Sequence, residues 1–301
     1  MLSKGIFGLE FDYFYKLTND ILIGSSALYP PSLGGNHPST INGGKVSNKG
    51  FELVLSHQNT IDKFQYNIRG NVGWSRNKVL RMNESPNVPD YQKRTGRKMG
   101  EKMGFITQGL YQSDEEIINS ATLGHLSKDQ IRPGDIHYKD LNGDGKIDKA
   151  QDYTFIGNNN LPELMYGLNI AAAWKNFDLS LFFQGAAITD VFLSGVYGNG
   201  HVDATIYTRP FHGKGNSPYF LIENSWTPEN PNAEFTRLST IAAEKGNCNG
   251  WASEWWIRDG SYLRLKNVQL GYTLKNSYIR NLGVDNIRLM LTGGNLFTWS
   301  K

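Results

Sequence analysis

The sequence has a single cysteine, little net charge and no long apolar run. Each shortage removes one structural or functional feature from consideration. Cys248 is the single cysteine, so it cannot form an internal disulfide, and pairing gives no information on redox compartment. The 31 basic and 28 acidic side chains leave a net charge of +3, which gives no electrostatic reason to expect a nucleic-acid partner. No apolar run reaches the roughly 18 residues that a transmembrane helix requires. The first residues also lack the ordered features of a signal peptide.

Helical periodicity is scarce as well. The best candidate is a short helix over residues 114–126, DEEIINSATLGHL, with Ser113 as its N-cap. Most of the remaining pattern has a period of two, which is the period of a β-strand.

Alternation of apolar and polar residues predicts an all-β fold. In residues 7–15, FGLEFDYFY, every second side chain is apolar or aromatic, so one strand face is apolar and the other mostly polar. The same pattern predicts seven strands of roughly 8–12 residues, at 7–15, 51–59, 64–75, 164–174, 177–187, 262–274 and 286–293. Such strands are typical of an antiparallel transmembrane β-barrel, although a soluble β-sandwich also alternates. The polar face would line a wet lumen with Glu10, Asp12, Glu52, Arg69, Asp178, Lys266 and Arg288.

The connections between these strands favour the barrel. Short links at Thr60–Lys63 and Lys175–Asn176 alternate with long ones at roughly 16–50, 76–163 and 188–261. Outer-membrane barrels combine short periplasmic turns with long extracellular loops in this way. Seven strands do not close such a barrel, and open edges cannot face lipid. We therefore expect either a portion of a larger barrel or pairing with other chains.

Several blocks of sequence together resemble one family. GDIHYKDLNGDGKID and FIGNNNLPELMYGLNIAAAWKNFDLSLFFQG are similar to the C-terminal half of SusC/RagA-family TonB-linked outer-membrane proteins of the Bacteroidota. VSNKGFELVLS, ENSWTPENPNAEFTRLS and WIRDGSYLRLKNVQLGYTL also resemble segments of that family, in the same order.

The resemblance implies a portion of a plugged barrel of about 22 strands. It also implies localisation in the outer membrane and import of glycans, oligosaccharides or peptides. The implied partners are a SusD-like surface lipoprotein, outer-membrane lipid and the TonB–ExbB–ExbD complex. Segments resembling the family's plug, TonB box and N-terminal extension are not found in this sequence, so contact with TonB would depend on a part of the protein outside it.

The segment KDLNGDGKID, residues 139–148, has the spacing of a calcium-binding loop. An EF-hand loop takes ligands from alternate residues and a final bidentate Glu, with an invariant Gly at its sharp turn. The corresponding ligands here are Asp140, Asn142, Asp144, the Lys146 carbonyl and Asp148, and Asp152, one residue beyond the last position, is a further candidate ligand. Gln151 replaces the bidentate Glu, and no flanking helices are apparent. The segment therefore predicts either a structural Ca²⁺ in a long loop or a Gly/Asp turn that needs no metal.

The long connection 188–261 is rich in aromatic residues. Trp226, Trp251, Trp255 and Trp256 are candidate solute contacts, because aromatic rings stack on the apolar faces of sugars. Loop packing or anchoring at the membrane interface is the alternative role for these side chains and for Tyr197, Tyr207 and Phe211.

We weigh three functions on this basis. The first is part of an importer, and the second is a calcium-stapled surface β-protein that binds partners. The third, a calcium-dependent hydrolase, lacks a nucleophile motif or a paired acid and base, so we expect no enzyme activity.

Overall fold

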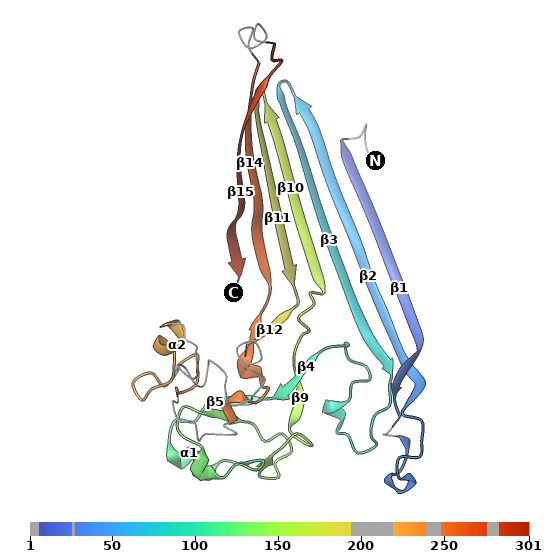
Figure 1. Ribbon diagram of the computed structural model, residues 1–301, viewed down its shortest axis with the longest axis vertical. Coiled ribbons are helices and arrows are strands. Elements are labelled where there is room, and N and C mark those ends of the chain that lie inside the picture. Colours follow the sequence, from blue (N-terminus) through green and yellow to red (C-terminus); the bar gives the residue numbers. More distant parts are fainter. Residues whose placement is uncertain (1–5, 26–27, 194–218, 239–247, 276–282, 301) are drawn as a thin grey trace.

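The computed structural model describes residues 6–25, 28–193, 219–238, 248–275 and 283–300, which form two unlike regions (Figure 1). One is a tall sheet of long strands. The other is a group of short strands and helices at one end of that sheet. We call it the loop module and define it as the described residues of 82–163 and 188–261. The candidate aromatic residues Tyr197, Tyr207 and Phe211 lie outside the described residues.

The sheet is antiparallel, and its strand order is β1-β2-β3-β10-β11-β14-β15. The bounds are β1 Phe7–Gly24, β2 Thr40–Ile61, β3 Phe64–Arg81, β10 Leu164–Trp174, β11 Phe177–Ala187, β14 Tyr262–Leu274 and β15 Ile287–Ser300. All seven predicted strands are therefore confirmed. β1 and β15 are the two edges, and the sheet of the described residues is open rather than closed into a barrel.

Two of the predicted connections are too long. β1 continues to Gly24 and β2 begins at Thr40, so the connection expected at 16–50 is only 25–39. β3 likewise continues to Arg81, which moves the start of the next connection from 76 to 82. Apolar alternation fades in these extensions, but Asn48 still pairs with Lys16 on one side and Asn77 on the other. Backbone hydrogen bonds continue the ladder without an apolar face, and the side-chain pattern does not report them.

The register gathers the apolar residues onto one face of the sheet. Leu55 lies opposite Leu9, and Ile170 lies opposite Ile68 and Leu181. Members of this face with large exposed side chains include Phe7, Phe11, Tyr13, Trp174, Phe177, Leu270, Leu289, Leu291, Phe297 and Trp299. An apolar surface that follows a whole sheet is far more extensive than the scattered exposed side chains of soluble proteins.

The opposite face is polar, as predicted. Arg288 donates to Asp178 at 2.5 Å between Nη2 and Oδ2, and Lys266 donates to Gln184 at 2.7 Å between Nζ and Oε1. A β-bulge shifts the register of β14 next to Lys266, which lets this side chain reach the polar face. The register places the predicted lumen residues Glu10, Asp12, Glu52 and Arg69 on this face as well.

Short turns close two hairpins at the end of the sheet away from the loop module (Figure 1). Asp62 and Lys175 occupy these turns with φ of 53° and 55°, in the left-handed region that tight hairpin turns require. The alternation of short and long links is therefore confirmed, and the described residues of the two long segments, 82–163 and 188–261, lie at one end of the sheet.

The loop module is built from four short strand pairs. They are β4 (Lys102–Phe105) with β9 (Tyr153–Gly157), β5 (Thr107–Leu110) with β7 (Ile136–Tyr138), β6 (Thr122–Leu123) with β8 (Lys146–Ile147), and β12 (Asp190–Phe192) with β13 (Ile257–Asp259). The helices are α1 (Asp114–Asn119) and α2 (Tyr219–Glu223), with 3-10 turns at Asp90–Gln92, Lys128–Gln130, Cys248–Gly250 and Glu254–Trp256; a further 3-10 turn, Pro31–Leu33, lies between β1 and β2. No helix of the described residues is long and apolar enough to cross a membrane.

The buried core of the described chain lies in this module and not in the sheet. Its members are Phe105, Leu110, Tyr111, Ile117, Leu123, Leu126, Ile131, Ile136, Tyr138, Ile147, Leu221, Phe235, Cys248 and Trp256. Cys248, the single cysteine, is a buried member of this core. The described residues of the two long loops therefore fold together into one packed unit.

The predicted helix over 114–126 is only half present. Ser113 caps α1 as expected, accepting the Glu116 N–H at 3.3 Å, but the helix ends at Asn119. Thr122 and Leu123 instead form β6, in which the Thr122 N–H donates to the Gly145 carbonyl at 2.9 Å. Pairing with a distant strand overrides the weak local helical preference.

Candidate functional site

The Asp-rich loop, residues 140–152, lies between β7 and β9 and contains the short strand β8. Its flanks are extended, as predicted, and Ile147 is buried in the module core. Gly143 and Gly145 have φ of 76° and 81°, a conformation that glycine adopts without strain. The loop thus has the tight turn that the sequence spacing indicated.

Asp140 and Asp144 organise the first half of the loop through backbone hydrogen bonds. The two carboxylate oxygens of Asp140 accept the N–H groups of Gly143 and Gly145 at 2.7 and 2.8 Å. Asp144 Oδ1 accepts the Lys146 N–H at 2.8 Å. The carboxylates therefore stabilise the turn directly.

Asp152 closes the second half of the loop. This fully buried carboxylate accepts the Leu141 N–H at 2.8 Å and the Asp148 N–H at 2.9 Å. Asp152 joins the two ends of the loop by accepting backbone N–H groups, whereas the final Glu of an EF-hand loop binds the metal with both oxygens. Lys146 lies 3.1 Å from Asp148 between Nζ and Oδ2, and a hydrogen bond from Lys146 is the main cause that lowers the pKa of Asp148.

The donor set of the loop is compatible with Ca²⁺ but is not assembled as a metal cage. Within the described residues, no three His, Cys, Asp or Glu side chains converge to hold a metal ion. The oxygens of Asn142 and the Lys146 carbonyl would have to complete any site. Carboxylate oxygens that accept one N–H keep a second lone pair, so calcium binding does not require these turns to break. The calcium site stays a prediction.

Of the four candidate tryptophans, Trp226, Trp251 and Trp255 are partly exposed, and Trp251 belongs to the cavity beside the Asp-rich loop. It lines a cavity of about 510 Å³ together with Phe105, His125, Ile147 and Lys149. The Trp251 ring packs on Phe105 at a centroid distance of 5.2 Å, which fixes its orientation. Because Ile147 belongs to the Asp-rich loop, the shape of this cavity depends on that loop.

The other three tryptophans lie outside this cavity. Trp226 donates from its indole nitrogen to Gln112 at 3.0 Å, and Trp255 lines a cavity of about 520 Å³ beside Gln108 and His137. Trp256 is fully buried and donates to the Asn249 carbonyl at 2.7 Å, so its ring has no face available to a solute.

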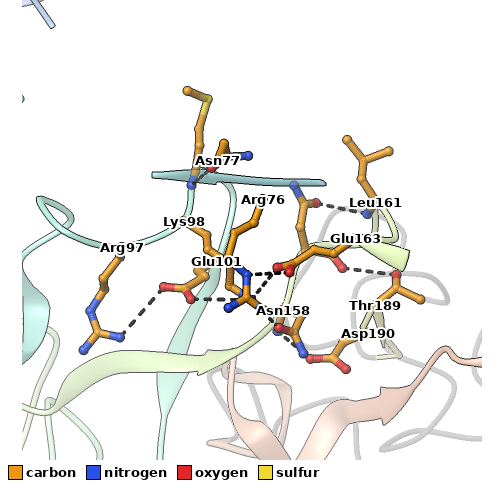
Figure 2. A network of polar contacts seen from close by, with 12 residues as sticks. Arg76, Asn77, Arg97, Lys98, Glu101, Asn158, Leu161, Glu163, Thr189 and Asp190 are labelled. Carbon is orange, nitrogen blue, oxygen red and sulfur yellow. Dashed lines mark hydrogen bonds and ion pairs between the residues drawn. The ribbon is translucent and has the colours of Figure 1, made fainter. Parts of the chain in front are cut away.

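A network of charged and polar groups joins the sheet to the loop module (Figure 2). Glu163, next to the start of β10, accepts from Arg76 of β3 and from Lys98 of the loop module, each at 2.7 Å. Lys98 also donates to Asn158 at 2.6 Å and lies 3.9 Å from Glu101. We call these residues the rim network.

The rim network extends to the link between β11 and β12. Asn158 donates its backbone N–H to Asp190, and the Asp190 N–H donates to the Asn159 carbonyl at 3.1 Å. Met99 donates its N–H to Asn77 of β3 at 2.6 Å. No local pattern predicts these contacts, because residues such as Arg76 and Glu163 lie 87 positions apart.

A buried ion pair holds three segments of the loop module together. Arg237 donates to Asp135 at 2.6 Å, and Asn249 donates to the same carboxylate oxygen at 2.8 Å. Asp135 is 1% exposed, and burial raises the pKa of its carboxyl even though Arg237 opposes that effect. This pair was also absent from the sequence-based predictions.

Burial shifts the titration of aromatic groups close to this core. It raises the pKa of Tyr111 to about 12, so the Tyr111 hydroxyl stays protonated at neutral pH and donates to Ser120 at 3.1 Å. His137 stacks on Tyr111 at a centroid distance of 4.2 Å. Burial lowers the pKa of His137, while the charge of Glu116 acts in the opposite direction.

The curated proteins that are similar to this chain are all described as TonB-dependent receptors. No protein-family model matches the chain. The chain is 28% identical to TonB-dependent receptor P3 of Formosa agariphila, over 97% of its own length and 28% of that protein. It is 21% identical to TonB-dependent receptor SusC of Bacteroides thetaiotaomicron, over 88% of its length and 24% of that protein. The chain thus spans less than a third of the length of these curated relatives.

Solved structures share the fold of this chain. A structure of the RagAB peptide transporter matches with a TM-score of 0.64 and 19% identity, covering 98% of this chain and 30% of that one. The RagAB peptide importer in an open-open state matches with a TM-score of 0.65 and 18% identity, covering 98% and 29%. The sequence relatives, and the fold that the chain shares with these structures, fit a portion of a SusC/RagA-family TonB-dependent receptor that covers the C-terminal part of the barrel.

Proposed function

We propose that this chain forms part of the wall and the external loops of an outer-membrane, TonB-dependent importer of glycans, oligosaccharides or peptides. The sheet is a membrane-spanning portion of the barrel, and the loop module lies outside the membrane at the entrance. A SusD-like lipoprotein is the proposed partner at this entrance. The chain binds and passes a solute and performs no covalent chemistry.

The observation that carries this proposal is the exposed apolar face of the sheet. Leu291 in β15 is 73% exposed and Phe11 in β1 is 61% exposed, and such side chains recur along every strand. Each Å² of apolar surface left in water forgoes about 25 cal/mol of stabilisation. A lipid bilayer removes that penalty, and the polar opposite face then lines an aqueous lumen.

The family relationship supports the import reading. The relatives are described as TonB-dependent receptors, and the structures of similar fold are described as a peptide transporter and importer. In our proposal the Trp251 cavity contributes a solute contact at the entrance, because its aromatic floor and polar rim suit an amphipathic ring or side chain.

Gene deletion and complementation test the proposal. Cells that lack the full-length protein should fail to take up either fluorescently labelled oligosaccharides or labelled peptides, and the intact gene should restore uptake. A complementing gene with Trp251→Ala should restore less uptake, whereas Trp226→Phe, at a partly exposed tryptophan outside the Trp251 cavity, should behave like the intact gene. Uptake of every solute that is unaffected by the deletion would contradict the importer proposal.

A calcium-stapled surface β-protein is the second candidate, favoured by the self-contained core of the loop module. The two candidates differ in their need for detergent. A barrel portion with an apolar outer face should leave outer-membrane fractions only with detergent, and its folded form should migrate differently from its boiled form on a gel. Release in salt or chelator alone would favour the surface protein.

A further inference from the structure

The outward face of β1, β2 and β3 changes character as it approaches the loop module. Tyr13, Phe51 and Trp74 form one cross-strand row of aromatic residues. The next row on the same face contains Tyr15, Lys49 and Arg76.

The row that follows adds a third cation. It consists of Leu17, Ser47 and Lys78. Side chains directly opposite in a sheet have Cβ atoms about 4.5–5.5 Å apart, and residues two apart along a strand are separated by about 6.8 Å. Lys49, Arg76 and Lys78 are therefore close enough together to contact the same anionic group or two adjacent ones. We call these three residues the basic rim.

The basic rim has free hydrogen-bond donors. Lys49 and Lys78 are exposed, and neither makes an ion pair or a side-chain hydrogen bond within the described part of the chain. Arg76 uses its Nε to bind Glu163, whose side chain is only 12% exposed, and its guanidinium carbon lies 5.4 Å from the centre of the Trp74 ring. This arrangement orients Arg76 and leaves its two terminal amino groups without a described partner.

We propose that the basic rim binds the phosphate groups of lipids in the membrane leaflet next to the loop module. This inference rests on the proposed function, because it requires the apolar face to be embedded in a bilayer. Aromatic side chains mark the boundary between hydrocarbon and headgroups, and the cations lie in the rows just beyond it. Arg supplies a planar fork that suits phosphate, and Lys supplies a compact charge.

The position of the cations favours lipid over a soluble anion. A pocket for a free phosphate would enclose it, whereas Lys49 and Lys78 project from an open sheet face that continues into an apolar surface. The polar face at the same height offers a matched comparison. Lys16 is exposed there, opposite Asn48, but it faces away from the basic rim and from the bilayer.

The test uses the full-length protein, purified in neutral detergent, and measures lipid binding by native mass spectrometry. The probe is a lipid A-type glycolipid carrying phosphates, compared with the same glycolipid after removal of its phosphates and with inorganic phosphate. We expect the phosphorylated glycolipid to bind the unaltered protein best. The Lys49→Gln/Lys78→Gln variant should bind roughly 25-fold more weakly, since each basic residue at a lipid surface contributes about a fivefold factor. Lys16→Gln should bind as the unaltered protein does.

Each other result overturns the inference. Equal binding of the dephosphorylated glycolipid would show that the phosphate is not recognised, and equal competition by inorganic phosphate would show a general anion site. If Lys16→Gln weakened binding of the phosphorylated glycolipid as much as the double substitution, the loss would reflect net charge rather than the basic rim. Lys49→Arg/Lys78→Arg should retain binding and guards against a folding defect in the Gln variant. Flotation of the protein with membranes, measured in parallel, separates failure of the lipid-binding inference from failure of the proposed function. A protein that floats with membranes but binds both glycolipids equally refutes only the lipid site.

Discussion

Leu123 in the loop module and Leu291 in the sheet are the same residue type, yet their side chains are 0% and 73% exposed. The two regions place apolar side chains by opposite rules. In the module, short strands and turns enclose a core, as in a soluble domain. In the sheet, long strands direct their apolar side chains outward and keep polar ones on the other face. The comparison teaches that one chain can contain two regions with opposite placement of apolar side chains. Strand length and the period of the apolar residues, rather than composition, distinguish the two regions.

The largest expected effect comes from breaking the buried ion pair of the module. Asp135→Ala removes the buried carboxylate to which Arg237 and Asn249 both donate, and it should cost about 3–5 kcal/mol. Hydrogen exchange of the full-length protein, read peptide by peptide, should show lost protection in the module and unchanged protection in the sheet.

The matched control for that change is on the polar face of the sheet. Asp178→Ala removes a partner of Arg288 from a pair that is open to solvent, which should cost at most about 1 kcal/mol. Equal loss of protection from both substitutions would contradict the distinction between a packed module and a solvated wall.

The same substitution at the two leucines compares the regions directly. Leu123→Ala opens a cavity in the module and should cost about 2–5 kcal/mol. Leu291→Ala removes an outward side chain and should change stability by about 0.5 kcal/mol or less. Exchange rates in the peptides containing each site provide the measurement, and a larger effect at Leu291 would argue that its face is covered by protein.

Introducing a charge should reverse that order. Leu291→Arg places a cation on the lipid-facing surface and should cost about 2–4 kcal/mol if that residue lies near the bilayer midplane. Ile118→Arg, at an exposed position of the module, should change stability by about 0.5 kcal/mol or less. The folded fraction in outer membranes, scored by its altered gel mobility before boiling, should fall for the first variant only. Tolerance of Arg at Leu291 would count against membrane insertion.

Calcium should stabilise the module and leave the sheet unaffected. Ca²⁺ at about a hundred times its dissociation constant stabilises a bound state by about 2.7 kcal/mol. Chelation should therefore increase hydrogen exchange in residues 140–152, and Asp144→Asn should weaken the response. Asp114→Asn removes a carboxylate of the module that lies outside this loop, and it should leave the response to calcium unchanged. Identical exchange with calcium and with chelator would leave the loop as a hydrogen-bonded turn without metal.

The smallest effect is a dependence of module stability on pH. Burial lowers the pKa of His137 in the folded state, so the unfolded chain takes up a proton more readily. The resulting stability is present above about pH 6.5, the ordinary value for histidine, and is lost as the pH falls through the lower folded pKa. Exchange of the peptide containing His137 should accelerate between neutral and mildly acidic pH. His137→Gln should flatten this response, and an unchanged response would assign it to other groups.

Local sequence pattern located all seven strands of the sheet. Three strands, 164–174, 177–187 and 262–274, begin and end where alternation predicts, because each is short and one face is apolar throughout. The pattern failed where apolar alternation fades, in the extensions of β1 and β2, since backbone pairing there does not depend on side-chain type. It also failed for the second half of the helix predicted at 114–126, where Thr122 pairs with a strand distant in sequence.

The sequence by itself determined the period-two strands, their order of short and long links, and the Gly and Asp positions of the turn at 140–152. These depend on neighbouring residues, so a linear pattern contains them. Only the tertiary structure decided that the long loops share one core, that Asp135 meets Arg237, and that Arg76 and Lys98 meet at Glu163. The partners in those contacts are far apart along the chain. Charge and burial become informative about them only after the fold has brought them together.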